Sequence, residues 1–460
     1  MKTDNELVLN LFTEAFEFVL DETISLSQHD HENIEGLATI AAPVQLEDPT
    51  PIVPPPNDFV FSRTIGEGGM GVVDAAVQLS LQREVALKRL RVTQRNDFFA
   101  DNLTQEALLL AKLDHPNITP IHLITSDEDG APMFAMKLIE GHSWITLMNQ
   151  PEHPFWEQIV GDRLEWNLRT LVQVCNAVSY AHSKGILHLD IKAENVMIGH
   201  FGEVFLIDWG VAMMLDFSGN VQRRVFAGTL SHAAPEMFLR HAPLTPKTDV
   251  FLLGVTLHEL ITGQSFRAEE TLNELLKSTL SVENAELTQI QDPELKQICS
   301  RAIAANPDER YSCVVDFSAA IQDHLTHRSA LETLFAGERV LQKLKSMRPG
   351  PEHSERTFQQ LAYQCKFAFE ETLRQVNLPA ATNGLCDVLT LMFRHELSKG
   401  DLHYARLHLS ALREIASAEI YAELQQALQE TMNRKLRSDE LATQIQYKLM
   451  EELKSKSGKV

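Results

Sequence analysis

The chain has 460 residues, and its 41 basic and 63 acidic residues give a net charge of −22. At this length two or three folded units are expected rather than one core. An acidic chain without a basic stripe argues against a nucleic-acid partner and against binding to an anionic membrane surface. The sequence has no stretch of about 18 uninterrupted apolar residues, so no membrane span is predicted.

The chain begins with Met1-Lys2-Thr3-Asp4, which lacks the basic and then apolar order of a secretory signal. Its cysteines form no CxxC pair, and buried thiols in a reducing compartment are the simplest interpretation. These features together predict a cytoplasmic protein. The five cysteines are Cys175, Cys299, Cys313, Cys365 and Cys386.

Residues 1–57 are strongly acidic, with eleven Asp or Glu residues and a single basic residue, Lys2. Within this stretch, residues 6–20 carry apolar side chains on one helical face and acidic side chains on the other. We interpret residues 1–41 as an acidic extension whose amphipathic helix packs on the rest of the chain or on a partner. Residues 42–57 include six prolines, which favour extended conformations and indicate a linker.

Short alternating strands begin at Phe59, and helices dominate beyond Thr104. Residues 58–327 are therefore predicted to form an α+β domain with a strand-rich lobe, a helix-rich lobe and a cleft between them. The clearest predicted elements are Phe59–Ser62, Val72–Val77, Glu84–Leu90, Trp166–Ser183 and Asp249–Thr262.

Residues 328–460 are predicted to be all α-helical, with breaks at Pro349-Gly350-Pro351 and at Leu378-Pro379. Residues Phe393–Ala405 resemble a helical hairpin of the tetratricopeptide kind, but such repeats need several copies to bury a core and one is recognisable. The last predicted helix, Ile420–Leu453, has no sustained heptads, which favours a solvated helix over a coiled coil. We expect this region to bind a partner or to regulate the preceding domain.

A glycine-rich stretch, Gly66-Glu67-Gly68-Gly69-Met70-Gly71, separates the first two predicted strands. In a dinucleotide-binding fold this motif would lead from a strand into a helix, whereas here a strand-like run follows. A glycine hairpin lets backbone amides approach phosphate groups without interference from Cβ atoms. No GK[ST] sequence follows the glycines, so a P-loop of the Walker type is excluded.

The third predicted strand carries a candidate phosphate-binding lysine. Strand alternation places Ala86 and Lys88 on one face, where a small residue leaves room for adenine and the lysine can reach phosphates. Most lysines on strands are surface residues, but Lys88 has apolar neighbours. Glu106, on the next predicted helix, is the carboxylate expected to hold Lys88 in place.

Polar residues that suit phosphoryl transfer follow in the helix-rich half. In-line transfer needs a carboxylate to orient a hydroxyl group and oxygen ligands for Mg²⁺. Asp190 fits the first role, and Asn195 and Asp208 fit the second, with Asp208 directly after the apolar strand Val204–Ile207. Lys192 can offset charge on the γ-phosphate.

These motifs occur in one order over about 170 residues and end with Ala234-Pro235-Glu236. Residues of about 59–325 resemble the eukaryote-type (Hanks-type) Ser/Thr protein kinases, with a similarity to their bacterial members. The resemblance implies a bilobal protein kinase fold with ATP and Mg²⁺ bound between the lobes. It also implies that the γ-phosphoryl group of ATP is transferred to serine or threonine hydroxyls of protein substrates.

The resemblance also assigns residues around the nucleotide. Ile65 and Val73 would lie above the base and Met197 below it, Met136 would be the gatekeeper, and Leu138 would belong to the hinge. The full set implied for ATP is Ile65, Gly66, Glu67, Gly68, Gly69, Met70, Gly71, Val73, Ala86, Lys88, Met136, Leu138 and Met197. The implied catalytic residues and metal ligands are, respectively, Asp190, Lys192, Lys88 and Glu106, and Asn195 and Asp208.

On the substrate side, residues 228–236 resemble the segment that binds the protein substrate in this family. Glu236 would then pair with Arg310, and Asp249 resembles the helix aspartate that braces the catalytic loop. Thr229, together with the lysine two residues after the catalytic aspartate, favours serine or threonine over tyrosine as the acceptor.

Two residues depart from the family pattern. Leu189 replaces the usual arginine before the catalytic aspartate, and that arginine normally pairs with a phosphorylated segment. Ser218 is the single hydroxyl-bearing residue between Gly210 and Gly228. Both features argue against control by phosphorylation of that segment. Trp209 replaces the usual phenylalanine and keeps a large apolar side chain. We therefore expect an active enzyme whose activity is constitutive or controlled by a partner.

Two alternatives are kept beside this interpretation. A pseudokinase that serves as a scaffold is disfavoured because the lysine, the carboxylates and the asparagine described above are all present. A small-molecule phosphotransferase shares the Ile207-Asp208-Trp209 pattern. Such enzymes lack the Ala-Pro-Glu segment and the lysine two residues after the aspartate, and this chain has both.

Overall fold

The computed structural model describes residues 58–457 with ten short gaps, at 69–70, 160, 217–218, 220, 222–227, 240–241, 268–273, 275–277, 280–283 and 348–352. The helix expected at residues 6–20 and the linker at 42–57 lie outside the described residues. The chain forms two compact units, Met1–His324 and Leu325–Val460. The boundary falls inside one continuous helix, α8 (Val314–Ser346).

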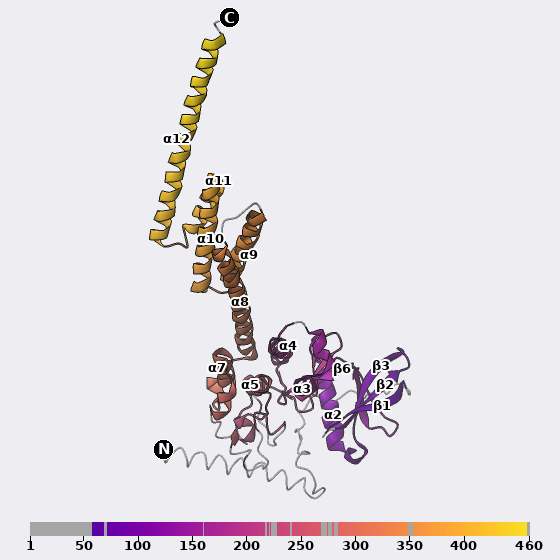
Figure 1. The fold of residues 1–460 in the computed structure, drawn as a ribbon. Helices are drawn as coiled ribbons and strands as arrows, with labels where there is room; N and C mark the ends of the chain where they lie inside the picture. The colour runs from indigo at the N-terminus through magenta and orange to yellow at the C-terminus, as the bar shows by residue number, and fades with distance from the viewer. Residues whose placement is uncertain are drawn as a thin grey trace, which may run out of the picture. The chain divides into compact units, whose positions relative to one another are not determined.

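The first lobe of unit 1 is an antiparallel sheet with the strand order β1-β2-β3-β5-β4. Its first three strands are labelled in Figure 1. Its strands are β1 (Phe59–Gly68), β2 (Gly71–Gln78), β3 (Arg83–Arg89), β4 (Ile121–Ser126) and β5 (Pro132–Lys137). Small and β-branched side chains such as Ala76 and Val85 let β2 and β3 pack into a buried layer. Helix α2 (Asp97–Leu110) contacts β4 and β5 and is capped by Asn96, whose side chain accepts from Phe99 N.

The second lobe of unit 1 is mainly helical. Its helices are α3 (Trp144–Asn149), α4 (Arg163–Ser183), α5 (Pro246–Thr262) and α7 (Pro293–Ala302). Its short strands form two small sheets and are β6 (Gly141–Ser143), β7 (Ile186–Leu187), β8 (Val196–Gly199), β9 (Val204–Leu206) and β10 (Met213–Met214). Helix α5 is apolar on nearly all sides because it packs against both α4 and α7. A strand-rich lobe followed by a helix-rich lobe is the predicted order.

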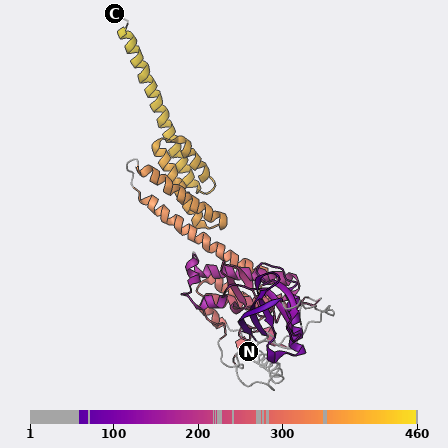
Figure 2. The ribbon, with the colours of Figure 1, turned by 90° about the vertical axis from the view of Figure 1, so that its right-hand side faces the viewer.

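Unit 2 is entirely helical within its described residues. Beyond α8 it contains α9 (His353–Gln375), α10 (Pro379–Lys399), α11 (Leu402–Leu412) and α12 (Ala418–Ser457). Gly400 ends α10 in the left-handed region and Asp401 caps α11, which confirms the helical hairpin predicted at this point. Its assignment to the tetratricopeptide kind stays a prediction. Helix α12, yellow in Figures 1 and 2, extends past the other helices of this unit, and residues 433–450 are exposed.

Helix length and apolarity also bear on membrane insertion. Among the residues that the structure describes, no helix is both long enough and apolar enough to cross a membrane. The long helices α8, α9 and α12 all carry charged residues throughout their length.

Candidate active site

Lys88 lies on β3 with its ammonium group between two carboxylates. Its Nζ atom is 2.6 Å from Glu106 Oε1, 2.9 Å from Glu106 Oε2 and 3.0 Å from Asp208 Oδ1. Strand alternation turns Lys88 inward, and its side chain is buried. Burial alone would lower the pKa of Lys88, but the charges of Asp208 and Glu106 outweigh it and raise that pKa above 10.5. The lysine is therefore held in its charged form.

The two carboxylates differ in environment. Glu106 is buried on α2, and burial raises its pKa, an effect that the nearby Lys88 ammonium opposes. Asp208 follows β9 and its side chain is 49% exposed, and the charge of Lys88 holds its pKa below 3.8. Glu106 therefore binds Lys88 in the interior. Asp208 also binds Lys88, but its exposed carboxylate can bind a further ligand.

Asp190 is the centre of a second cluster of hydrogen bonds. Its Oδ1 atom accepts from Thr229 N at 2.9 Å and from Thr229 Oγ1 at 2.6 Å. Asn195 Nδ2 donates to both Asp190 O and Asp190 Oδ2 at 2.8 Å. Lys192 Nζ donates to Thr229 Oγ1 at 2.5 Å and lies 3.5 Å from Asp190 Oδ2. The carboxylate is consequently fixed in orientation from both sides.

Asp249 on α5 binds the backbone of the loop that carries Asp190. Asp249 accepts from the backbone N–H groups of His188 and Leu189, both at 2.9 Å, and lies 2.7 Å from His182 Nε2. Burial would raise the pKa of Asp249, but the His182 contact and these bonds hold it below 3.8. Leu189 has a φ of 67°, a left-handed conformation that is strained for leucine. These bonds hold the strained residue in place.

Trp209 fills the position next to Asp208. It is buried, its ring centroid lies 4.5 Å from that of His188, and its Nε1 donates to Leu206 O at 3.3 Å. Asp208 itself has a φ of 59°. The large indole ring therefore anchors this turn in the interior while the carboxylate points to Lys88.

The glycine-rich stretch forms the predicted hairpin, in which Gly68 of β1 is opposite Gly71 of β2. A Cβ atom at Gly71 would lie 2.4 Å from Arg89 O, so only glycine fits there. Gly66 and Gly68 have no atom within 4 Å of such a Cβ, so the space beside them is open. This arrangement fits a phosphate-bearing ligand that approaches the backbone closely. Gly69 and Met70 lie outside the described residues.

The residues implied for the nucleoside come from both lobes. Val73 is opposite Lys88, and Ala86 is opposite Met136, in the sheet of the first lobe. The remaining residues of this set lie at three places: Ile65 at the glycine hairpin with 42% exposure, Leu138 just beyond β5, and Met197 on β8 of the second lobe.

Comparison with known proteins agrees with this geometry. Residues 59–327, more than half of the chain, match the model of the family described as protein kinase domain. The chain belongs to the eukaryote-type Ser/Thr protein kinase family. This family uses ATP and Mg²⁺.

Two curated relatives are both described as serine/threonine-protein kinase PknD. The protein of Chlamydia caviae is 34% identical over 57% of this chain and 30% of its own length. That of Protochlamydia amoebophila is 30% identical over 60% of this chain and 31% of its own length. The chain therefore spans about a third of the length of these relatives.

Several contacts of the kinase domain were missed by reasoning from the sequence. Thr229 was singled out there, but its direct bonds to Asp190 were not expected. His182, at the end of α4, was not identified as the partner of Asp249, because 67 residues separate them. The pair Glu236–Arg310, which the resemblance implied, is present with Nη1–Oε1 at 2.6 Å.

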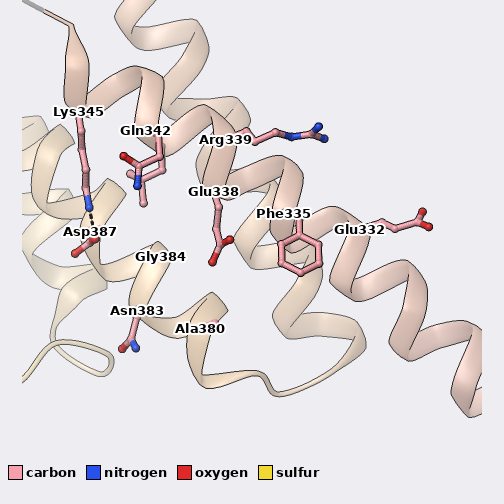
Figure 3. Close-up of a pocket in the computed structure, with 11 residues that line it drawn as sticks. Glu332, Phe335, Glu338, Arg339, Gln342, Lys345, Ala380, Asn383, Gly384 and Asp387 are labelled. Atoms are coloured by element: carbon pink, nitrogen blue, oxygen red, sulfur yellow. Dashed lines mark hydrogen bonds and ion pairs between the residues drawn. The ribbon is translucent and has the colours of Figure 1, made fainter. Parts of the chain in front are cut away.

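Two hollows lie away from these residues. One, of about 1050 Å³, is in unit 2 between α8 and α10, where Phe335 and Gly384 line it and Lys345 pairs with Asp387 (Figure 3). The other, of about 720 Å³, is lined by β1, the β4–β5 turn and Arg89. None of the residues implied for catalysis, ATP or metal lines either of them.

Proposed function

We propose that the chain is an ATP-dependent Ser/Thr protein kinase. The observation that carries this proposal is the position of the Lys88 ammonium between Glu106 and Asp208. A buried ammonium is costly unless it is paired, and here carboxylates from two different elements pair with it. A pseudokinase scaffold would not need the lysine, both carboxylates and the Asp190 cluster together.

In this proposal each side chain has one role. Lys88 would bind the α- and β-phosphates, and Asn195 and Asp208 would hold Mg²⁺, which prefers oxygen ligands. ATP would supply the γ-phosphoryl group, and the glycine hairpin would cover its phosphates. Asp190, oriented by Thr229 and Asn195, would accept the proton of the substrate hydroxyl.

The remaining roles concern the group that accepts the phosphoryl group. Lys192 lies 3.5 Å from Asp190 Oδ2 and would offset negative charge on the γ-phosphate during transfer. Protein substrates are implied by the family, and Thr229 beside Asp190 favours serine or threonine acceptors. The alternative of a small-molecule phosphotransferase is disfavoured because the buried Glu236–Arg310 pair fixes the segment on which a protein substrate would lie.

The test is phosphoryl transfer from γ-labelled ATP with Mg²⁺ and dephosphorylated casein. The variants are Asp190→Asn and, as a matched control, Asp101→Asn, an exposed position on α2. We expect label on serine or threonine with the wild type and the control, and none with Asp190→Asn. Nucleotide binding without any transfer by the wild type would support the scaffold instead.

We also propose a binding role for unit 2. Tyr363 and Phe367, one turn apart on α9, are 54% and 62% exposed, which is unusual for aromatic side chains in a free helix bundle. A chain that ends after α8 should still transfer phosphate if unit 2 only recruits a partner. Loss of transfer in a folded truncated chain would instead assign unit 2 to the catalytic machinery.

A further inference from the structure

Residues 228–236 connect the Asp190 cluster to the pair formed by Glu236 and Arg310. Both ends of this segment are fixed, at one end by Thr229 Oγ1, 2.6 Å from Asp190 Oδ1, and at the other by the ion pair. The middle of the segment has anchors of its own, which neither the sequence motifs nor the proposed chemistry use.

The first of these anchors is a buried chain of hydrogen bonds. Ser231 Oγ lies 3.1 Å from His232 Nδ1, and His232 Nε2 lies 3.0 Å from Glu259 Oε2 on α5. Phe266 N donates to the other Glu259 oxygen at 3.2 Å. Because an ionised carboxylate only accepts, Glu259 accepts from His232 Nε2, and the other ring nitrogen of His232 shares a hydrogen bond with the Ser231 hydroxyl. One imidazole therefore joins the segment to the core helix.

The second anchor is Arg267, which follows α5. Its Nη1 donates to Ser231 O at 3.2 Å and to Ala233 O at 2.9 Å, and its guanidinium lies 4.9 Å from the centre of the Phe266 ring. Only 4% of Arg267 is exposed. A planar guanidinium that binds two carbonyls of one short segment fixes the path of that backbone.

The positions of His232, Glu259 and Arg267 indicate which step of the reaction their contacts support. A substrate hydroxyl must reach the carboxylate of Asp190, whose Oδ1 atom is already bound by Thr229. The chain that carries the hydroxyl must therefore pass beside the residues that follow Thr229. The groups assigned to the ATP phosphates lie instead on the glycine hairpin between β1 and β2 and on β3.

We propose that His232, Glu259 and Arg267 are positioning residues that hold residues 228–236 in the conformation that binds the protein substrate. This inference rests on the proposed kinase function. Loss of an anchor should let the segment shift, and a misplacement of about 1 Å can cost about 100-fold in rate. The loss should appear with the protein substrate and not with ATP.

The experiment measures kcat/KM for dephosphorylated casein, KM for ATP, and ATP hydrolysis without casein, all on the full chain. Replacement of the histidine by leucine (His232→Leu) should lower kcat/KM for casein at least about tenfold. KM for ATP and hydrolysis should change less than about twofold. His232→Gln, which keeps an N–H donor for Glu259, should recover part of the loss.

Two further variants separate positioning from folding. Leu295→Ala removes a buried side chain from α7 and lowers stability without touching the segment. It should leave the ratio of the casein and ATP parameters unchanged. Arg267→Lys replaces the guanidinium, whose Nη1 binds both carbonyls, by an ammonium group. A smaller loss with casein is expected, and this variant serves if His232→Leu does not fold.

Three results would overturn the inference: a folded His232→Leu variant with unchanged kcat/KM for casein, a parallel rise of KM for ATP, or the same selective loss in Leu295→Ala. Each of these results is compared with phosphoryl transfer to casein by the wild type. If the wild type itself transfers no phosphate to casein, the proposed function fails and not the positioning role. The two failures are therefore distinct.

Discussion

Lys88 Nζ lies 3.0 Å from Asp208 Oδ1, although 120 residues separate the two in the chain. This bond joins β3 of the first lobe to the turn after β9 of the second. The same ammonium also binds Glu106 on α2. One buried charge therefore links three elements that carry residues implied for catalysis, ATP and metal.

Removal of the Glu106 charge should misplace Lys88. In Glu106→Gln the lysine keeps Asp208 but loses the carboxylate that holds it on the other side, so we expect kcat/KM for ATP to fall about 100-fold. Steady-state kinetics at varied ATP, with Glu128→Gln at an exposed turn as control, measure this. Equal kinetics for the two variants would show that Glu106 does not position the lysine.

Gly228 should tolerate no side chain. It has a φ of 122°, and a Cβ there would lie 2.8 Å from Leu189 O, next to Asp190. Gly202 also has a positive φ, 83°, but open space around its Cβ position. We expect Gly202→Ala to cost roughly 1–2 kcal/mol of stability from backbone strain alone. Gly228→Ala should lose phosphoryl transfer as well, and casein phosphorylation together with thermal unfolding of both variants tests this. Equal transfer by the two folded variants would contradict the predicted clash.

Asp208 should make stability depend on pH in the acid range. Lys88 holds its pKa below 3.8, and a carboxyl with a lowered folded-state pKa stabilises the fold above its unfolded pKa. That contribution is lost as pH falls through the lower folded value. The difference in unfolding free energy between the wild type and Asp208→Asn should thus be constant above about pH 5 and shift in favour of the variant in acid.

Urea unfolding from about pH 3 to about pH 7 measures this difference. Asp101→Asn, which also removes one carboxylate but at an exposed position, supplies the control. Parallel curves for Asp208→Asn down to the lowest pH would show that the Lys88–Asp208 pair contributes no stability.

Activity should not require phosphorylation of the segment between Gly210 and Gly228. Leu189, where the family usually has an arginine, is buried and offers no charge to a phosphate group. We expect phosphatase treatment and the variant Ser218→Ala to change kcat/KM for casein less than about twofold. A large loss in either case, with recovery upon rephosphorylation, would overturn this expectation. Ser218 itself lies outside the described residues.

Reasoning from the sequence was strongest where a feature depends on neighbours in the chain. The glycine hairpin follows from glycines between two strand patterns, and the α10–α11 hairpin from Gly400-Asp401 between two helical ones. The inward orientation of Lys88 follows from strand alternation beside apolar residues. Family resemblance added the pair Glu236–Arg310, which spacing by itself does not give.

Contacts between distant segments were decided by the tertiary structure. His182 meets Asp249 because α4 and α5 pack together. Thr229 meets Asp190, and His232 meets Glu259, where residues 228–236 contact the catalytic loop and α5. No local pattern marks these partners. Each bond depends on the relative positions of two helices and a loop, and those positions are set by the packing of the whole core.

The boundary between the two compact units likewise depends on tertiary packing and not on a local sequence pattern. The domain boundary predicted between residues 327 and 328 and the boundary between the compact units, at His324 and Leu325, both fall inside the continuous helix α8. Composition does not change within a helix that serves two cores. The sequence by itself determined which residues could carry phosphoryl-transfer chemistry and which segments form hairpins, because these depend on residue type and local spacing. Only the tertiary structure decided which groups orient Asp190 and hold residues 228–236, because those contacts arise when segments far apart in the chain are packed together.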